Sequence, residues 1–357
     1  MVGRKDASFS LERPVIAPDS AIVSEYLEGR KVLVTGAGGS IGSELCRQIA
    51  SCGPKSLMLL GRGENSIFEI NQELSEAGWG NLLETIIADV RDRHKLEQVF
   101  ATHSPDVVFH TAAHKHVHLM ERHPDEAVKN NIFGTANIAQ VARDYGVSTF
   151  VLVSSDKAVN PTSVYGATKK AAEYIVQDLS RDGTTKFIVV RFGNVIRSRG
   201  SIIPIFERQI RNGGPVTVTH PDMERFFMSI PEAAYLVLQS GGVARSGQVC
   251  VLDMGNPVKI LGLVRYLIEK VGLNPETDIE IVVTGAKPGE KMVEELVSAE
   301  GQLQVSQWEK ILFDEPDRID SEQLHRELEG MRLQIEAGDM EGILRQLRRL
   351  VPSYAPV

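Results

Sequence analysis

One short stretch of the sequence, SSDKAVNPTSVYGATKK from Ser154 to Lys170, gathers side chains that could act together on a hydroxyl group. Tyr165 and Lys169 stand four residues apart and share one face of a helix. A lysine ammonium beside a phenol, together with a positively charged nicotinamide ring, lowers the pKa of the tyrosine. Such a tyrosine removes the hydroxyl proton while hydride leaves the same carbon, and Ser155 could hydrogen-bond that hydroxyl. The alternative is a solvated turn that enters a helix.

A glycine-rich loop precedes this stretch in the chain. TGAGGSIGSE places Gly36, Gly39 and Gly42 in the spacing GxxGxxG, directly after an apolar run and before a helical pattern. Glycine lets backbone N–H groups approach a pyrophosphate, which then lies at the positive end of the helix dipole. The alternative is a tight turn that binds no ligand. No GxxxxGK[ST] motif is present, so a nucleotide triphosphatase is not supported.

The ends of the next two apolar runs bear on the choice between NAD and NADP. An acidic residue at the end of the second run would bind the adenosine ribose of NAD, whereas Gly61-Arg62 leaves room and a guanidinium for the 2′-phosphate of NADP. We therefore favour NADP, with NAD as the alternative because Glu64 is near. Arg62 could equally be a surface charge. The third run ends at Asp89-Val90, where it could meet the adenine.

Strand-length apolar runs alternate with helical patterns from Lys31 to about residue 192. The runs are KVLVT, SLMLL, ETIIAD, DVVFH, TFVLVSS and KFIVVRF. This alternation predicts an α/β fold, a Rossmann-type doubly wound parallel sheet with helices on both faces. We predict an N-terminal arm (1–30), an NAD(P)-binding core (31–192) and a smaller C-terminal substrate-binding lobe with C-terminal helices (193–357), some segments of which return to the core.

Composition restricts the class of protein. The 357 residues are 42% hydrophobic and 24% charged with a net charge of −8, which is typical of a globular protein and argues against a nucleic-acid partner. The three cysteines have no metal-type spacing and suggest a reducing compartment. No uninterrupted apolar run reaches the roughly 18 residues that cross a bilayer. We expect a cytoplasmic protein that does not span the membrane, and a homo-oligomer.

A cluster of histidines raises a metal hypothesis. HTAAHKHVHLMERH contains an HxHxH pattern, and alternate residues of a strand share one face. The segment follows a strand and runs into a helix, however, and has no companion cysteine or carboxylate set. We predict no metal here, and instead a loop beside cofactor and substrate.

Several motifs resemble one family closely. TGAGGSIG, the strand-end serine and YGATK are similar to those of extended short-chain dehydrogenase/reductases. SSDKAVNPTSVYGATK, AAHKHVHLMERHPDEAVKNNIFGT, RFGNVIRSRGSIIPIF, THPDMERFFMSIPEA and KPGEKMVEEL resemble the bacterial polysaccharide-biosynthesis UDP-N-acetylglucosamine 4,6-dehydratases. The likeness runs from about Phe9 to Tyr354, and the Asp156-Lys157 pair is its most specific mark. Membrane-anchored relatives carry an additional N-terminal region, so the resemblance implies a soluble form.

The resemblance implies a three-step reaction with a nicotinamide cofactor that stays bound and is regenerated each turnover. Tyr165 would be the base for oxidation at C4, which makes the C5 proton acidic. Lys157 would act at C5 and Asp156 would protonate the departing C6 hydroxyl, after which hydride returns to C6. Lysine serves as a base only if its pKa is depressed, and we expect Lys169 and desolvation to depress it.

The resemblance also implies a site for a UDP-sugar. Two departures from the family pattern are that Lys287 replaces the arginine of RPGEK, and that Tyr165 stands where many anchored relatives have methionine. The predicted catalytic residues are Ser155, Asp156, Lys157, Tyr165 and Lys169. The predicted cofactor-binding residues are Gly36, Gly39, Ser40, Ile41, Gly42, Arg62, Asp89, Val90, Ala112, Tyr165 and Lys169. The predicted substrate-binding residues are Lys115, Asn194, Ser201, Arg225, Lys287 and Glu290.

Two other functions remain open at this point. A UDP-sugar 4-epimerase of the same superfamily would need Ser155, Tyr165 and Lys169 but not the Asp156-Lys157 pair. A non-catalytic NADP-binding redox sensor would need none of these side chains intact.

Overall fold

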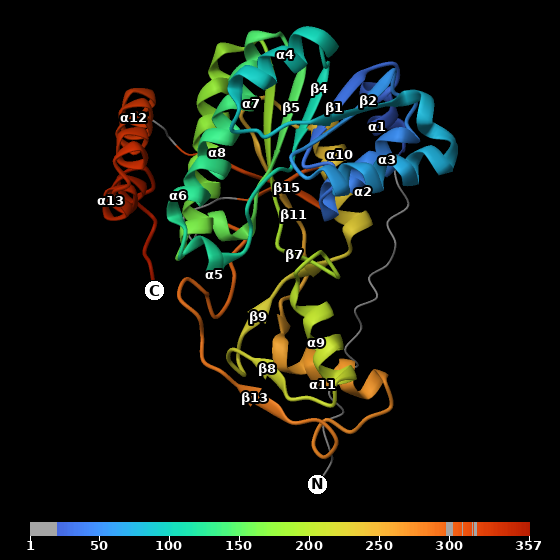
Figure 1. Ribbon diagram of the computed structural model, residues 1–357, viewed down its shortest axis with the longest axis vertical. Helices are drawn as coiled ribbons and strands as arrows, with labels where there is room; N and C mark the ends of the chain where they lie inside the picture. The colour runs from blue at the N-terminus through green and yellow to red at the C-terminus, as the bar shows by residue number, and fades with distance from the viewer. Residues whose placement is uncertain (1–19, 298–302, 309, 316, 318–319) are drawn as a thin grey trace.

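A nine-stranded sheet forms the centre of the larger part of the molecule (Figure 1). The computed structural model describes residues 20–297, 303–308, 310–315, 317 and 320–357. The strand order is β3-β2-β1-β4-β5-β6-β11-β15-β14, and all strands run in the same direction except β15, which is antiparallel to both of its neighbours. The strands are β1 (Lys31–Thr35), β2 (Ser56–Gly61), β3 (Leu83–Ile87), β4 (Val107–His110), β5 (Thr149–Val153), β6 (Lys186–Arg191), β11 (Val249–Leu252), β14 (Gln304–Val305) and β15 (Ile311–Asp314).

Helices cover both faces of this sheet because most of its strands are apolar on both sides. One face packs against α1 (Ser20–Leu27), α2 (Ser40–Ala50), α3 (Glu64–Leu74) and α10 (Ile230–Val243). The other face packs against α4 (Arg93–His103), α7 (Gly134–Asp144) and α8 (Val164–Leu179). The order 3-2-1-4-5-6 with helices on both faces is that of the doubly wound dinucleotide-binding fold. The predicted fold class is confirmed.

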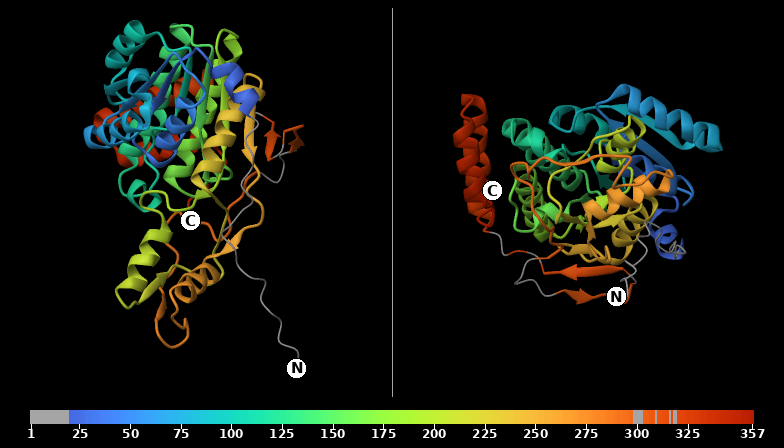
Figure 2. Two further views of the ribbon diagram at one scale, coloured as in Figure 1. Left: turned by 90° about the vertical axis from the view of Figure 1, so that its right-hand side faces the viewer. Right: turned by 90° about the horizontal axis from the view of Figure 1, so that it is seen from below.

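A pair of C-terminal helices adds a further layer outside α8. They are α12 (Ser321–Ala337) and α13 (Met340–Leu350), and their apolar side chains join the core on the α8 face. Seen from below, the pair lies on one flank of the molecule, opposite the flank formed by α3 (Figure 2). The short elements of the larger part are η1 (Ser75–Trp79), η2 (Gly80–Leu82), α5 (Val117–Met120), α6 (Pro124–Ala127), η3 (Val128–Phe133), η4 (Asp156–Ala158) and η5 (Ser180–Asp182).

A smaller lobe lies below the carboxyl ends of the parallel strands (Figure 1). It has its own apolar core, which includes Ile203, Phe206, Val216 and Leu263. Its elements are α9 (Ile202–Arg211), β8 (Val216–Val218), β9 (Glu224–Arg225), β12 (Val258–Lys259), α11 (Ile260–Lys270) and β13 (Ile281–Val283). The short strands β7 (Asn194–Val195) and β10 (Phe227–Met228) pair at the junction with the larger part.

The chain passes between the two parts more than once. It leaves the sheet after β6, forms the first half of the lobe, and returns with α10 and β11 before it forms the rest. Residues 1–19 of the predicted arm lie outside the described residues, and Ser20–Leu27 is a helix packed against α10. The division of the chain into three functional units stays a prediction.

Candidate active site

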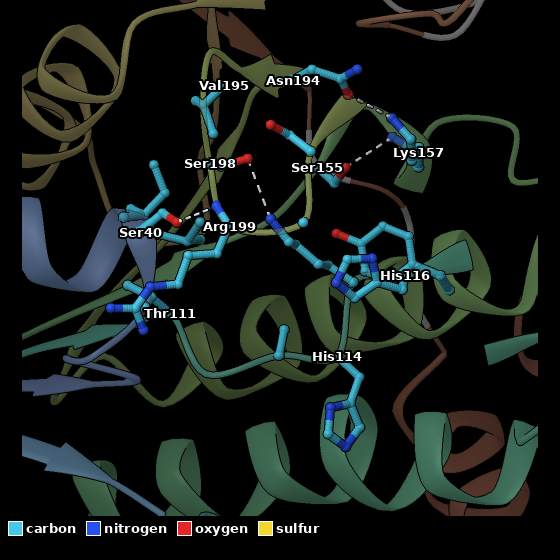
Figure 3. Close-up of a pocket in the computed structure, with 18 of the residues that line it drawn as sticks. Ser40, Thr111, His114, His116, Ser155, Lys157, Asn194, Val195, Ser198 and Arg199 are labelled. Atoms are coloured by element: carbon cyan, nitrogen blue, oxygen red, sulfur yellow. Dashed lines mark hydrogen bonds between the residues drawn. The ribbon is translucent and has the colours of Figure 1, made fainter. Parts of the chain in front are cut away.

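Two adjoining cavities open at the carboxyl ends of the parallel strands. The larger cavity, of about 520 Å³, lies between the ends of β1, β4, β5 and β6 and the smaller lobe (Figure 3). The smaller cavity, of about 320 Å³, extends over the ends of β2 and β3. Open α/β sheets bind ligands in this crevice, where the strand order reverses between β1 and β4.

The structure brings most of the predicted site residues to these cavities. The larger cavity is lined by Gly39, Ser40, Ile41, Gly42, Lys115, Ser155, Lys157, Tyr165, Lys169, Asn194 and Ser201. The smaller cavity is lined by Gly36, Gly39, Arg62, Asp89, Val90 and Ala112. Asp156 and Arg225 are buried beside the larger cavity without lining it, whereas Lys287 and Glu290 line neither.

The glycine loop is packed too closely for larger residues. Gly36 has φ +68°, and a Cβ there would lie 2.9 Å from the amide nitrogen of Ala112. A Cβ on Gly42 would lie 2.2 Å from the carbonyl oxygen of Gly36. No side chain caps the start of α2, so its first N–H groups remain available to an anion. The loop therefore fits a dinucleotide pyrophosphate.

The residues expected at the adenosine end carry opposite charges. Arg62 Nη1 lies 4.0 Å from Asp89 Oδ2, and Arg91 Nη2 donates to the same oxygen at 2.7 Å. Burial raises the pKa of Asp89, but the hydrogen bonds from Arg91 outweigh it and the net pKa is lowered. A carboxylate thus stands beside the guanidinium on which the preference for NADP rests.

The helix that carries Tyr165 and Lys169 is held at its first turn. Ser163 Oγ accepts a hydrogen bond from the amide of Gly166 at 3.0 Å, and Glu121 Oε1 accepts one from the amide of Val164 at 2.6 Å. These contacts satisfy amides that a helix start leaves unpaired. Both tyrosine and lysine are buried and line the larger cavity together with Ser155.

The protein's own groups do not lower the pKa of Tyr165 as expected. Burial raises it, against the opposing effects of hydrogen bonding with Ser155 and the charge of Lys157. Lys169 instead donates to the carbonyl of Val153 at 2.8 Å, and burial lowers its own pKa to about 8. Within the chain, the lysine that acts most strongly on the phenol is therefore Lys157.

A buried network of charges fixes the middle of α8 to the sheet. Glu173 Oε1 accepts from Arg191 Nε at 2.8 Å and from Ser154 Oγ at 2.6 Å, while Arg191 Nη1 donates to Asp314 Oδ2 at 2.7 Å. Buried charges persist when they are paired in this way. The network joins α8, the end of β5, β6 and β15 next to the segment 154–170.

Asp156 and Lys157 belong to a second cluster of charges at the cavity. Lys157 Nζ donates to Asp156 Oδ1 at 3.1 Å, to Asn194 Oδ1 at 3.2 Å, and forms an ion pair with Glu294 Oε1 at 3.2 Å. Glu294 Oε1 also lies 3.7 Å from Arg225 Nε. Figure 3 shows the Lys157 side chain pointing toward Asn194, while its backbone amide donates to Ser155 Oγ at 3.3 Å. Two carboxylates and two cations thus form one group.

The expectation of a depressed pKa for Lys157 is wrong for this structure. Burial alone lowers the pKa of the ammonium, but the carboxylates of Asp156 and Glu294 outweigh burial and raise it. Burial raises the pKa of the Asp156 carboxyl, whose Oδ2 is buried without a hydrogen-bond partner among the described residues. Sequence reasoning missed Glu294, although it lies in KPGEKMVEEL, four residues after the chosen Glu290.

The turn that carries Asp156 and Lys157 packs directly on α8. A Cβ on Gly166 would lie 2.2 Å from the carbonyl oxygen of Lys157. Only glycine therefore permits α8 and η4 to approach this closely. The contact holds the Tyr165 helix and the Asp156-Lys157 turn together.

The remaining predicted substrate residues differ in their surroundings. The hydroxyl of Ser201 is buried at the cavity without a partner among the described residues, as expected of a group that receives a ligand. Lys115 Nζ donates to Ser198 Oγ at 3.3 Å. The amide of Lys287 donates to Glu290 Oε2 at 3.1 Å in an exposed turn outside both cavities.

The histidine-rich segment is divided between the core and the cavity. His110 is buried between the hydroxyls of Thr35 and Thr135, and burial lowers its pKa to about 3. His114 and His116 line the larger cavity (Figure 3). Within the described ranges, no group of three or more metal-ligand side chains is placed to hold an ion.

Fold and site together define the class of the extended short-chain dehydrogenase/reductases, in which a serine, a tyrosine and a lysine meet beside a dinucleotide loop. The chain belongs to the polysaccharide biosynthesis protein family, whose sequence pattern matches residues 32–316.

Three relatives illustrate the range of this group. The probable polysaccharide biosynthesis protein EpsC of Bacillus subtilis is 55% identical over 289 residues, which are 81% of this chain and 48% of EpsC. The inverting UDP-N-acetylglucosamine 4,6-dehydratase of Campylobacter jejuni is 31% identical over 76% of this chain and 78% of that protein. The UDP-glucose 4-epimerase of Rickettsia rickettsii is likewise 31% identical, with the same coverage. The chain thus lies among nucleotide-sugar dehydratases and epimerases, and spans about half the length of EpsC.

Solved structures share the fold. Pen from Bacillus thuringiensis matches with a TM-score of 0.75 and 34% identity, over 82% of this chain and 90% of Pen. DesIV, a dTDP-glucose 4,6-dehydratase from Streptomyces venezuelae with NAD and TYD bound, matches with a TM-score of 0.64 and 21% identity, over 74% of this chain and 87% of DesIV. In the part of the chain that the structure describes, no helix has the length and apolar character needed to span a bilayer.

Proposed function

We propose that the chain is an NAD(P)-dependent nucleotide-sugar 4,6-dehydratase that converts UDP-GlcNAc to UDP-2-acetamido-2,6-dideoxy-4-hexulose. The observation that carries the proposal is the direct Lys157–Asp156 hydrogen bond of 3.1 Å at the cavity that Tyr165 lines. An epimerase needs the tyrosine but has no use for a paired acid and base beside it. The dehydratase relative from Campylobacter supports the same reaction class.

The oxidation half of the reaction belongs to Ser155, Tyr165 and Lys169. Ser155 Oγ orients the C4 hydroxyl, Tyr165 removes its proton, and the positive charges of Lys157 and, more weakly, Lys169 favour the phenolate. A nicotinamide dinucleotide held there would supply the hydride acceptor for C4 and the hydride donor for C6. The glycine loop and the two adjoining cavities fit such a dinucleotide. Arg62 favours NADP, whereas Asp89 and the NAD-bound relative DesIV keep NAD as the alternative.

The elimination half belongs to Asp156 and Lys157. In a site closed by the sugar, a proton passes from Lys157 Nζ to Asp156, because two neutral groups are easier to bury than two charges. This single transfer produces both groups that the elimination needs: a neutral amine that takes the C5 proton and a carboxylic acid that protonates the leaving C6 hydroxyl. The ammonium formed on Lys157 then returns a proton to C5 when hydride reaches C6. Once Lys157 is neutral, Arg225 remains as a cationic partner of Glu294, with its Nε 3.7 Å from Glu294 Oε1. The net change is loss of one water from the sugar.

A single incubation tests this function. The full chain with NAD+ or NADP+ and UDP-GlcNAc in deuterated water should give a product lighter by one water after correction for incorporated deuterium, with NMR signals of a 6-deoxy-4-ketosugar. A product of unchanged mass and altered C4 configuration would instead identify a 4-epimerase. Absence of turnover of UDP-sugars despite tight dinucleotide binding would indicate a redox sensor.

Lys169 should give the oxidation step an alkaline limit. Its pKa of about 8 means that the ammonium is present below that pH and is lost as pH rises through it. The rate of dinucleotide reduction in a single turnover should therefore fall above about pH 8. Lys169→Arg should be slower but keep its remaining rate to higher pH, because guanidinium does not titrate there. An unchanged alkaline limb in Lys169→Arg would exclude Lys169 as its source.

Glu294→Gln should impair water loss more than C4 oxidation. Without its charge, Arg225 and Lys157 lack one counter-ion, so Asp156 is held as a carboxylate and no longer supplies a proton. We expect elimination to slow about 10- to 100-fold while reduced dinucleotide still forms. Glu295→Gln is the matched control, since the Glu295 side chain is exposed and accepts a hydrogen bond from Asn160 Nδ2. Equal behaviour of the two variants would contradict a role for Glu294.

A further inference from the structure

A segment of the smaller lobe lies across the glycine loop of the larger part. In this strap, residues 198–201, the amide of Arg199 donates to Ser40 Oγ at 2.9 Å (Figure 3), and Arg199 Nη1 donates to the carbonyl of Gly38 at 2.9 Å. Ser198 accepts from Lys115. Gly200 has φ +70°, and a Cβ there would lie 2.6 Å from His116 Cε1. Three consecutive strap residues thus contact the dinucleotide-binding half.

Arg199 stands at the boundary of the two cavities. Gly39, Thr111, Ala113, His114 and Arg199 line both of them. A dinucleotide that places its nicotinamide in one cavity and its adenosine in the other must pass its pyrophosphate through this boundary. Of these five residues, Arg199 alone carries a permanent positive charge.

Besides the Gly38 carbonyl, the guanidinium has one acidic partner among the described residues, and that ion pair is weak. Arg199 Nη2 lies 3.0 Å from Glu69 Oε2, and the two side chains are 65% and 63% exposed. Such a surface ion pair contributes little, whereas a phosphate accepts two parallel hydrogen bonds from one guanidinium. A pyrophosphate on the glycine loop is therefore a better partner than Glu69.

We propose that Arg199 is a pyrophosphate ligand of the dinucleotide, supplied by the smaller lobe, and that it retains the cofactor between turnovers. The inference rests on the proposed function for the identity of the cofactor. It also goes beyond it, because it makes the substrate lobe part of the cofactor site. A dehydratase reduces and reoxidises the same nicotinamide within one turnover, so it does not need to exchange its dinucleotide with solution. Retention of the dinucleotide between turnovers therefore suits this reaction.

Cofactor binding by the full chain, measured without any sugar, tests the proposal. Calorimetric titration with NAD+ and NADP+ gives Kd, and displacement of fluorescent NADH or NADPH by excess oxidised dinucleotide gives the dissociation rate. Arg199→Ala should raise both by about tenfold or more, and Arg199→Lys by less. Arg197→Ala is the matched control, because Arg197 in the same segment pairs with Glu207 of the lobe at 2.8 Å.

The variant Glu69→Gln distinguishes two roles of Arg199: a ligand of the pyrophosphate, or a residue that only attaches the strap to α3. If Arg199 binds pyrophosphate, loss of Glu69 frees the guanidinium, and affinity should stay the same or increase. If Arg199 only fastens the strap to α3, Glu69→Gln should weaken binding as Arg199→Ala does, which would overturn the proposal. Values for Arg199→Ala within twofold of the unchanged chain would overturn it too.

The result is independent of turnover. An unchanged chain that binds dinucleotide with the expected dependence on Arg199 but fails to dehydrate UDP-GlcNAc would refute the proposed function alone. If the chain dehydrates UDP-GlcNAc but Arg199→Ala binds dinucleotide as tightly as the unchanged chain, this inference alone would be refuted.

Discussion

Tyr165→Phe is expected to lower the rate of C4 oxidation about 10²- to 10⁴-fold, the range usually seen when a general base is removed. The ring is buried at the cavity, so phenylalanine retains its packing and removes only the hydroxyl. Dinucleotide should still bind with ordinary affinity, because the glycine loop is unaffected. The measurements are single-turnover reduction of bound NAD(P)+ by UDP-GlcNAc and a parallel binding titration.

Tyr174→Phe provides the control for this prediction. Tyr174 lies on the same helix, and its ring contacts the Lys170 ammonium at 5.3 Å rather than the cavity. We expect it to oxidise at the rate of the unchanged chain. If Tyr165→Phe kept more than a tenth of that rate, another group would have to be the base.

Asp156→Asn is expected to separate oxidation from dehydration. Asparagine matches the shape of aspartate but cannot receive the proton of Lys157 and deliver it to the C6 hydroxyl. Water loss should slow about 10²- to 10⁴-fold, while C4 oxidation changes much less. Reduced dinucleotide and a 4-keto sugar that retains its C6 hydroxyl should therefore accumulate, visible by absorbance and by mass.

A surface aspartate serves as the comparison. Asp125 pairs with Lys129 outside both cavities, so Asp125→Asn should leave both steps unchanged. Full dehydratase activity in Asp156→Asn would show that another acid protonates the leaving group. Loss of oxidation and elimination together would show that Asp156 mainly positions Ser155, whose hydroxyl donates to it at 2.9 Å.

The parallel core was predictable because its signals are local. The run KVLVT followed by TGAGGSIG determines a strand, a loop and a helix start from neighbouring residues alone, and β1 and α2 lie at those positions. The helix at Ser20–Leu27 was missed because its eight residues are stabilised by packing against α10, more than two hundred positions later.

The electrostatics of the site were not predictable in the same way. The pKa of Lys157 was judged from its sequence neighbours, but Glu294 arrives from a distant loop and reverses the expected shift. Arg199 was overlooked for the same reason, because its contacts with Gly38 and Ser40 exist only after the lobe folds back on the glycine loop. Local patterns therefore indicate which residues line the candidate site, and the tertiary fold sets their protonation.

The close contact at Gly166 has a consequence for how such enzymes diverge. The carbonyl oxygen of Lys157 occupies the space that a side chain at Gly166 would need. An inserted or deleted residue in the 156–158 turn would therefore displace α8. Side-chain changes at positions 156 and 157 leave this contact intact, because it involves only the backbone carbonyl of Lys157 and the Cα of Gly166. The two residues that distinguish the proposed dehydratase from an epimerase can therefore change while α8 keeps its place.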